Sequence, residues 1–343
     1  MAKALEADLD DPLLLAERWA GEGQGVALAT VIETWGSSPR PVGSHLVIHA
    51  DGRFQGSVSG GCVEGEVVNE AADVIATGTP RVLAFGVADE TAWGAGLSCG
   101  GRIRGFVEKV AWQWDLATLA ELNALRRQRR AAILVTDIVT GSTRLVREDE
   151  VAGDALEGEL VARLRSGRSG LVFEPGKDEV FLAVHLPPPR LVVVGAVHIA
   201  QSLHVMARLA GFDVTIVDPR TAFATPERFP GCDIIAEWPQ DVLPRLALDR
   251  FTAVAALTHD GRIDDLPLRA ALDADCFYVG ALGSRKTHEK RVQRLLDAGA
   301  SVAQVARIRA PIGLPIAAQS PAEIAVAILA EVIDSLRKRG TQS

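Results

Sequence analysis

The sequence predicts an α/β protein, in which a C-terminal Rossmann-like, doubly wound parallel sheet is joined to a smaller N-terminal α+β domain. After three consecutive prolines at 187–189, short apolar segments alternate with helical stretches, a pattern typical of parallel βα units. Before them, turn signals such as Asp51-Gly52 link apolar segments, as in antiparallel hairpins. Because prolines stiffen a chain, we expect a linker there between domains at 1–186 and 190–343, and 343 residues suit about two domains.

Hydrophobic periodicity places the elements of the N-terminal domain. Apolar residues at spacings of three and four predict a helix from residue 62 to Gly78, which is placed to cap its C-terminus. Another helix ends in a cluster of four arginines, Arg126, Arg127, Arg129 and Arg130, which could form a phosphate patch. Because the cluster lies in the last turn, where cations complement the helix dipole, we prefer to interpret it as a solvated face. The expected helices cover 11–20, 62–77, 115–130 and 154–165, the strands 26–32, 45–49, 54–58, 81–85 and 102–110, and further hairpin turns 140–142 and 175–176.

The C-terminal domain is expected to hold five short buried strands. Its last helix opens at Ser320-Pro321-Ala322-Glu323, a capping box with proline at the first helical position. Ile324, Ile328, Val332 and Leu336 then form a helical apolar stripe. The strands are expected at 191–194, 214–217, 234–236, 253–257 and 277–279.

Charge and hydropathy limit the class of protein. Lys and Arg number 36 against 44 Asp and Glu, a net charge of −8, which argues against nucleic acid or an anionic membrane as the main partner. The longest strongly apolar run, at 191–197, is too short to cross a bilayer, and the acidic N-terminus is unlike a signal peptide. We therefore expect a cytoplasmic protein.

Two loops place a cysteine beside a glycine pair. They are Ser59-Gly60-Gly61-Cys62 and Ser98-Cys99-Gly100-Gly101, and glycines let backbone amides reach a ligand. Cys62 also lies at the expected start of a helix, where the dipole favours the thiolate, a soft ligand. No C-x-x-C pair suggests a zinc site or a disulfide framework. The alternative is ordinary buried cysteines, the interpretation we prefer for Cys232 and Cys276.

A serine-rich turn precedes these loops. Ser37, Ser38 and Arg40 could supply hydroxyls and a guanidinium to an anionic group. A plain turn rich in serine would look the same.

The first strand of the C-terminal domain leads into a turn at Gly195 with the context of a dinucleotide-binding fingerprint. Asp218 ends the next strand, 23 residues after Gly195, where an acid that binds ribose is expected. Val197 stands where a second glycine would let a pyrophosphate approach the backbone. The pattern supports the fold better than it supports a bound NAD.

Other polar groups are expected at the same edge of the parallel sheet. Thr258 and His259 follow the fourth strand, and His198 follows the first. The fifth strand leads into the turn and helix start formed by Gly283, Ser284, Arg285 and Lys286, which suits phosphate. Alternatively, Ser284 is only a helix cap, the two cations face water, and the histidines are structural.

Taken together, the motifs resemble the XdhC/CoxI family. They are Gly36-Ser37-Ser38-Pro39-Arg40, Gly56-Ser57-Val58-Ser59-Gly60-Gly61-Cys62-Val63-Glu64, Leu97-Ser98-Cys99-Gly100-Gly101, the turn at 195–200, the segment 280–286 and Pro311-Ile312-Gly313-Leu314. The resemblance covers about residues 26–333, with the motifs in order.

The resemblance implies an accessory factor for molybdenum hydroxylases of the xanthine dehydrogenase, aldehyde oxidase and CO dehydrogenase class. Such a chaperone binds molybdenum cofactor, as molybdopterin or molybdopterin cytosine dinucleotide, protects it while a cysteine desulfurase supplies the terminal sulfido ligand, and delivers it to the apoenzyme. Cys62 and Cys99 would approach molybdenum or its dithiolene, and the C-terminal crevice would hold the phosphate or nucleotide portion. The residues near the metal would be Cys62, Cys99, Gly60, Gly61, Glu64, Gly100 and Gly101.

The sequence departs from the family at two positions. Val197 and Ala317 stand where the family usually has glycine, and both add side-chain bulk. Two alternatives therefore stay open. One is an NAD(P)-dependent oxidoreductase in which Asp218 holds the ribose and His259 moves a proton, and the other is a docking scaffold that holds no cofactor. A homodimer is the expected oligomeric state.

Overall fold

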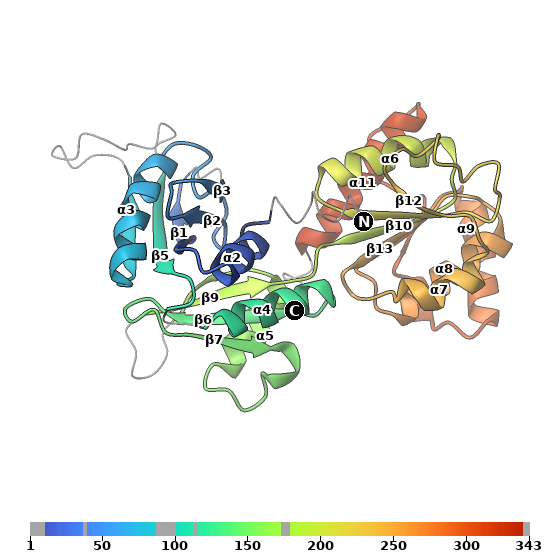
Figure 1. The fold of residues 1–343 in the computed structure, drawn as a ribbon. Coiled ribbons are helices and arrows are strands. Elements are labelled where there is room, and N and C mark those ends of the chain that lie inside the picture. Colours follow the sequence, from blue (N-terminus) through green and yellow to red (C-terminus); the bar gives the residue numbers. More distant parts are fainter. Residues whose placement is uncertain (1–10, 37–39, 87–100, 113–114, 173–178, 339–343) are drawn as a thin grey trace. The chain divides into compact units, whose positions relative to one another are not determined.

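The computed structural model describes residues 11–36, 40–86, 101–112, 115–172 and 179–338 (Figure 1). The chain divides into two compact units, Met1–Pro187 and Pro188–Ser343. The division falls within the run of prolines. By chain length the N-terminal unit is the larger one, but each of its two sheets has fewer strands than the C-terminal sheet.

The N-terminal unit holds two antiparallel sheets. The first has the strand order β3-β2-β1-β5-β4 and the second the order β7-β6-β9-β8. The strands are β1 Val26–Trp35, β2 His45–His49, β3 Phe54–Gly56, β4 Arg81–Phe85, β5 Arg102–Lys109, β6 Ala132–Asp137, β7 Thr143–Arg147, β8 Gly170–Val172 and β9 Val180–His185. The helices are α2 Pro12–Gly21, α3 Glu64–Thr77, α4 Leu116–Arg127 and α5 Glu157–Ser166, with the short 3₁₀ helix η1 Glu148–Glu150.

Successive side chains of a strand point to opposite sides of a sheet, and strand β1 is buried on both of these sides. Ala27, Ala29 and Val31 pack in the core beneath α3, which lies along this sheet in Figure 1. Val26 and Leu28 pack in a second core that α2, α4 and the second sheet also line. This double burial explains the continuous apolar run that predicted the strand.

Five strand ends of the first sheet lie at one end of it. Here β1 ends at Trp35, β2 begins at His45, and β3 ends at Gly56. At the same end β4 finishes at Phe85 and β5 begins at Arg102, since Trp35 pairs with Arg102 and Phe85 with Ile103. The segments that carry the glycine and cysteine motifs therefore all connect to the sheet at this end.

The C-terminal unit is built on a six-stranded parallel sheet of strand order β12-β11-β10-β13-β14-β15. Its strands are β10 Arg190–Val194, β11 Asp213–Val217, β12 Asp233–Ile235, β13 Thr252–Ala256, β14 Tyr278–Ala281 and β15 Ile308–Arg309. Its helices are α6 His198–Leu209, α7 Pro239–Leu246, α8 Gly261–Asp273, α9 Arg285–Asp297, α10 Val302–Val305 and α11 Pro321–Lys338. The order reverses between β10 and β13, which is where open α/β sheets bind ligands.

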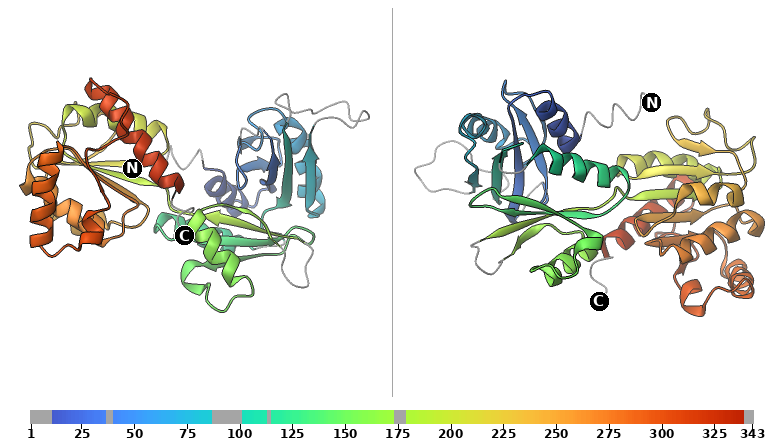
Figure 2. Two further views of the ribbon diagram at one scale, coloured as in Figure 1. Left: turned by 180° about the vertical axis from the view of Figure 1, so that it is seen from behind. Right: turned by 60° about the horizontal axis from the view of Figure 1, so that its bottom comes forward.

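Helices cover both faces of this sheet, as the views in Figure 2 show. Residues of α6 and α11 form one core with it, and residues of α7, α8 and α9 form the other. The five predicted strands are confirmed within two residues, and β15 is an addition too short to give a sequence signal. The predicted capping box is confirmed, because the Glu323 amide donates to Ser320 Oγ at 3.2 Å and the Ser320 amide donates to Glu323 at 3.3 Å.

The arginine cluster at the end of α4 is only partly a solvated face. Arg126 is half-buried, and its guanidinium donates to Asp11, the N-cap of α2, and to Asn123 Oδ1 at 2.8 Å. The solvated-face interpretation is therefore wrong for Arg126, because this side chain joins two helices. In the part of the chain that the structure describes, no helix combines the length and apolarity needed to cross a membrane.

Candidate functional site

The loop between β3 and α3 folds around the side chain of Glu64. This carboxylate is 6% exposed and lies at the start of α3. It accepts hydrogen bonds from both serine hydroxyls of the loop, from Ser57 at 2.6 Å and from Ser59. It also accepts from backbone amides, namely those of Val58 (3.2 Å), Ser59 (2.9 Å), Gly60 (3.1 Å), Gly61 (2.8 Å) and Val63 (3.3 Å).

These contacts correct one expectation from the sequence. The amides beside the glycine pair were expected to face a ligand, but they donate to Glu64 instead. Burial alone would raise the pKa of Glu64, yet the hydrogen bonds from Ser57 and Ser59 outweigh it and bring the pKa to about 2. The loop thus encloses a permanently ionised carboxylate, in an arrangement of amides that elsewhere binds external anions.

Gly60 and Gly61 give this loop its shape. Their φ values are 81° and 114°, a region that side chains disfavour. A Cβ atom on Gly61 would have open space around it, so backbone conformation and not crowding requires glycine there. Because the chain turns back in this way, several successive amides reach a single carboxylate.

Cys62 lies at the surface of the loop. Its side chain is exposed, and its amide donates to Ser59 Oγ at 2.9 Å. Helix α3 begins at Glu64 with Val63 as its N-cap, so Cys62 precedes the cap instead of occupying the first turn. The Glu64 carboxylate, in the first turn of α3, complements the positive end of the helix dipole.

The other predicted members of this site are described only in part. Arg40 lies next to the loop, and its Nε donates to the Ser57 carbonyl oxygen at 3.2 Å. Gly101 is buried immediately before β5. Ser37, Ser38, Cys99 and Gly100 lie outside the described residues.

In the C-terminal unit, the turn after β10 packs against the loop after β13. Gly195 has a φ of 114°, and a Cβ there would lie 2.7 Å from Thr258 Cγ2. Helix α6 starts at His198, which is exposed, and the apolar Val197 before it cannot cap the helix with its side chain. Val197 is half-buried and packs against the core below α6, which accounts for a branched residue where the family usually has glycine.

Asp218 is fully buried, and other groups of the protein already use its carboxylate. It accepts from the Ala196 amide at 2.7 Å, and from Arg220 through the backbone amide at 2.9 Å, Nε at 2.9 Å and Nη2 at 2.6 Å. The hydrogen bond to Asp218 raises the pKa of Arg220. A carboxylate engaged in this way has little capacity left for ribose hydroxyls, which counts against the NAD(P) hypothesis.

A buried ion pair supports the loop after β13. Thr258 donates its hydroxyl to Asp264 Oδ1 at 2.6 Å, and Arg291 Nη2 lies 3.8 Å from Asp264 Oδ2 and donates to the Leu282 carbonyl oxygen. Both charged side chains are about 1% exposed. Burial raises the pKa of Asp264 and lowers that of Arg291. The sequence analysis missed this pair and Arg220, although an acid in the first turn of α8 and the Asp-x-Arg spacing were available as signals.

His259 meets the glycine turn that follows β14. His259 is exposed with a φ of 63°, and a Cβ on Gly283 would lie 3.6 Å from His259 Nδ1. Ser284 caps α9 by accepting from the Thr287 amide at 3.2 Å, as one of the two interpretations predicted. Arg285 and Lys286 are exposed in the first turn. A capped helix start with two exposed cations still suits an anion.

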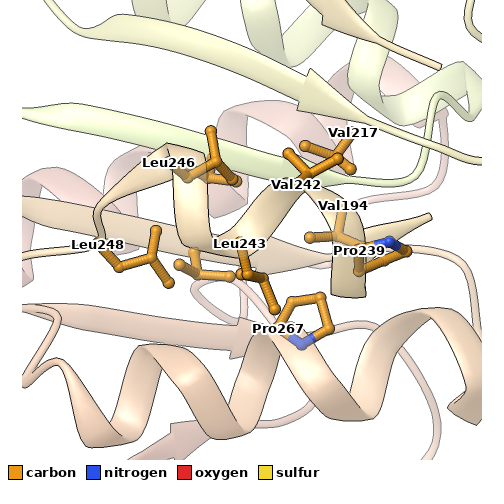
Figure 3. A pocket seen from close by; sticks show the side chains of 10 residues that line it. Val194, Val217, Pro239, Val242, Leu243, Leu246, Leu248 and Pro267 are labelled. Carbon is orange, nitrogen blue, oxygen red and sulfur yellow. The ribbon is translucent and has the colours of Figure 1, made fainter. Parts of the chain in front are cut away.

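An apolar pocket lies apart from these groups, between the sheet and helices α7 and α8 (Figure 3). Its lining includes Val194, Val217, Val242, Leu246 and Pro267, without a polar side chain. The pocket therefore has no polar side chain that could orient a charged ligand. Among the described residues, no group of three or more His, Cys, Asp or Glu side chains is placed to hold a metal ion.

Comparison with known proteins identifies the family. Residues 191–332 match the XdhC Rossmann domain, and residues 19–86 match the XdhC and CoxI family. The chain is 31% identical over 311 residues to the molybdenum cofactor insertion chaperone PaoD of Escherichia coli (strain K12), covering 90% of this chain and 83% of that protein. This chain belongs to the XdhC and CoxI family.

Two further proteins are similar to this chain over nearly its whole length. A probable xanthine dehydrogenase subunit from Bacillus subtilis (strain 168) is 27% identical, covering 91% of this chain and 93% of that protein. A crystal structure described as a xanthine dehydrogenase from Bacillus halodurans is 26% identical, with a TM-score of 0.71 and 96% of each chain covered. The resemblance stated from the motifs is confirmed, and so is the α/β fold with its Rossmann-type sheet.

The second departure from the family motifs also has a structural account. Ala317 has a φ of 57°, in the left-handed region. A left-handed φ favours glycine, the residue that the family resemblance led us to expect here. The backbone conformation is kept here with alanine, at a cost of roughly 1–2 kcal/mol.

Proposed function

We propose that this protein binds molybdenum cofactor, protects it during sulfuration and delivers it to an apo molybdenum hydroxylase. One observation carries the proposal for this chain. The three motif segments connect to the same end of the first sheet, where Cys62 is exposed on a loop held by internal hydrogen bonds. The relative named a molybdenum cofactor insertion chaperone supports the maturation role.

The chemistry of the cargo matches two kinds of site in the chain. At one end, molybdenum bound by a dithiolene is soft, and a thiolate is a soft ligand, so Cys62 and Cys99 are the residues proposed to face it. At the other end, a phosphate or nucleotide is an anion. Exposed Arg285 and Lys286 at the start of α9, with His198 and His259, are proposed to meet that end.

Two protein partners follow from this role. The apoenzyme must receive the cofactor, and a cysteine desulfurase is the source of the sulfur that becomes the terminal sulfido ligand. We propose that both dock on a homodimer of this chain. The cargo is molybdopterin or its cytosine dinucleotide form.

Anaerobic gel filtration tests the proposal. The purified protein is mixed with cofactor released from a molybdoenzyme, and the protein peak is assayed for molybdenum and for the fluorescence of oxidised pterin. Wild type is expected to retain near-stoichiometric cofactor, and Cys62→Ala and Cys99→Ala are expected to retain several-fold less. Cys232→Ala is the matched control, because Cys232 is half-buried beside β11 and donates to the Val214 carbonyl oxygen.

Two results would contradict the proposal. Equal retention by all three variants would remove Cys62 and Cys99 from the site. No retention by folded wild-type protein, together with pull-down of the hydroxylase, would favour the docking scaffold that holds no cofactor. A fluorescence change on titration with NADH or NADPH would favour the oxidoreductase instead.

A further inference from the structure

The backbone amides of the loop that carries Cys62 already bind an anion, which is the carboxylate of Glu64 in the same chain. Glu64 Oε1 accepts from Ser57 Oγ and from the amides of Val58, Ser59 and Gly60. Its Oε2 accepts from Ser59 Oγ and from the amides of Gly61 and Val63. Both oxygens are therefore used, because a carboxylate offers about four lone-pair sites. The amides that they occupy cannot also bind a phosphate.

Cys62 is connected to this carboxylate through one side chain. The Cys62 amide donates to Ser59 Oγ at 2.9 Å, and the Ser59 hydroxyl donates to Glu64 Oε2. The Val63 amide also donates to Ser59 Oγ at 2.9 Å, and Val63 is a buried core residue. The backbone on both sides of the thiol is thus held by the Ser59–Glu64 contact while the thiol itself stays exposed.

We propose that Glu64 is a positioning residue, whose carboxylate fixes residues 57–63 so that this loop meets its ligand through the Cys62 thiol and not through backbone amides. The ligand class is therefore a soft, sulfur-ligated metal and not a phosphate. That last step rests on the proposed function, but the positioning role does not.

Two variants separate the charge of Glu64 from the hydroxyl group that links Glu64 to Cys62. Glu64→Gln keeps the length, removes the charge and turns an NH₂ group toward the amide donors. Ser59→Ala keeps the charge but removes the hydroxyl that links Glu64 to Cys62. Glu66→Gln is the matched control, because Glu66 is exposed in the same first turn of α3.

The first readout is amide hydrogen exchange in a peptide that covers residues 57–63. Glu64→Gln is expected to speed exchange by roughly tenfold or more, since hydrogen bonds to a charged group are lost. Ser59→Ala is expected to have a smaller effect in the same direction, and Glu66→Gln to match wild type. Unchanged exchange in Glu64→Gln would overturn the proposal. If Glu64→Gln fails to fold, the Ser59→Ala result decides in the same way.

The second readout is the rate at which iodoacetamide alkylates Cys62 at a single pH, followed by mass spectrometry of its peptide. Glu64→Gln and Ser59→Ala are both expected to raise this rate several-fold, because the backbone on both sides of the thiol is no longer held by the Ser59–Glu64 contact. Glu66→Gln should react like wild type, and wild-type rates in both loop variants would reject the positioning role. Buried Cys276 should remain slow in every variant.

Cofactor retention separates this inference from the proposed function. Faster exchange and faster alkylation of Cys62, with cofactor retention equal to wild type, would support the positioning role and reject this loop as the cofactor site. Loss of cofactor retention in Cys62→Ala, together with normal exchange in Glu64→Gln, would support this loop as the cofactor site and reject the positioning role. Inorganic phosphate tests whether the loop amides can bind an external anion. Its addition should not slow amide hydrogen exchange in residues 57–63 of the wild-type protein.

Discussion

The imidazole rings of His45 and His185 stack in parallel between the two sheets of the N-terminal unit, with their centroids 5.7 Å apart and their planes inclined by 8°. His45 Nδ1 lies 3.0 Å from Thr30 Oγ1. In the described part of the chain, neither Nε2 atom has a hydrogen-bond partner, and both are buried. The pair is therefore accommodated only in its neutral form.

Acid should destabilise the N-terminal unit through this pair. Burial, with a smaller effect of the Arg126 charge, lowers the pKa of His45 to about 4, and burial also lowers the pKa of His185. Because both values lie below the unfolded value of about 6.5, protonation favours the unfolded chain. The free energy of unfolding should fall by about 2 kcal/mol for His45 alone between pH 7.5 and pH 5.

Hydrogen exchange of the β2 and β9 peptides, measured at both pH values, checks this expectation. His45→Gln and His185→Gln should each have a weaker pH dependence than wild type. A dependence that survives in both variants would place the acid sensitivity elsewhere.

Glu108 gives the opposite dependence on pH. It lies on β5 and is 5% exposed, and burial raises its pKa to about 8. The folded protein thus holds Glu108 protonated at neutral pH, while the unfolded chain releases that proton above about pH 4.5. Stability should fall as the pH rises from 4.5 to 8, and Glu108→Gln should be more stable than wild type by roughly 1–3 kcal/mol at pH 8.

Urea unfolding from pH 5 to 9, followed by circular dichroism, measures this difference. The gain should shrink toward pH 5, because the free-energy difference caused by the unequal pKa values falls as the pH approaches the unfolded pKa of about 4.5. Glu66→Gln serves as an exposed control in the same unit. A gain that does not depend on pH would show that packing, and not ionisation, separates Glu108→Gln from wild type.

The buried pair in the C-terminal unit should be sensitive to removal of one partner. Asp264→Asn leaves the Arg291 guanidinium buried without its counter-charge, and we expect a loss of about 3 kcal/mol in the free energy of unfolding. The double variant Asp264→Asn, Arg291→Met should lose less than Asp264→Asn alone, since no lone buried charge remains. Chemical denaturation of wild type, Asp264→Asn, Arg291→Met and the double variant gives the coupling, and strictly additive losses would mean that the pair does not interact.

The sequence predicted the elements well because burial leaves a local pattern. Strand β10 and helix α11 show it, one as a continuous apolar run and the other as a stripe behind a capping box. Side-chain contacts leave no such pattern. Glu64 was identified from its motif as a residue near the cofactor, but only the folded loop shows that its carboxylate turns back onto the preceding amides. His45 and His185 are 140 positions apart, and nothing local marks them as a stacked pair.

The N-terminal turn of α9 provides a test of the proposed anion site. Arg285→Ala combined with Lys286→Ala removes both exposed cations while Ser284 still caps the helix. Each cation near an exposed anion contributes roughly 0.5 kcal/mol, so the affinity for cytidine 5′-monophosphate should fall about fivefold, and the loss should shrink in high salt. Lys290→Ala is the matched control, because Lys290 is exposed further along the same helix. Isothermal titration at low and high salt measures these affinities. Equal affinities for the double variant and Lys290→Ala would leave Arg285 and Lys286 as solvated helix residues, the alternative that the sequence itself left open.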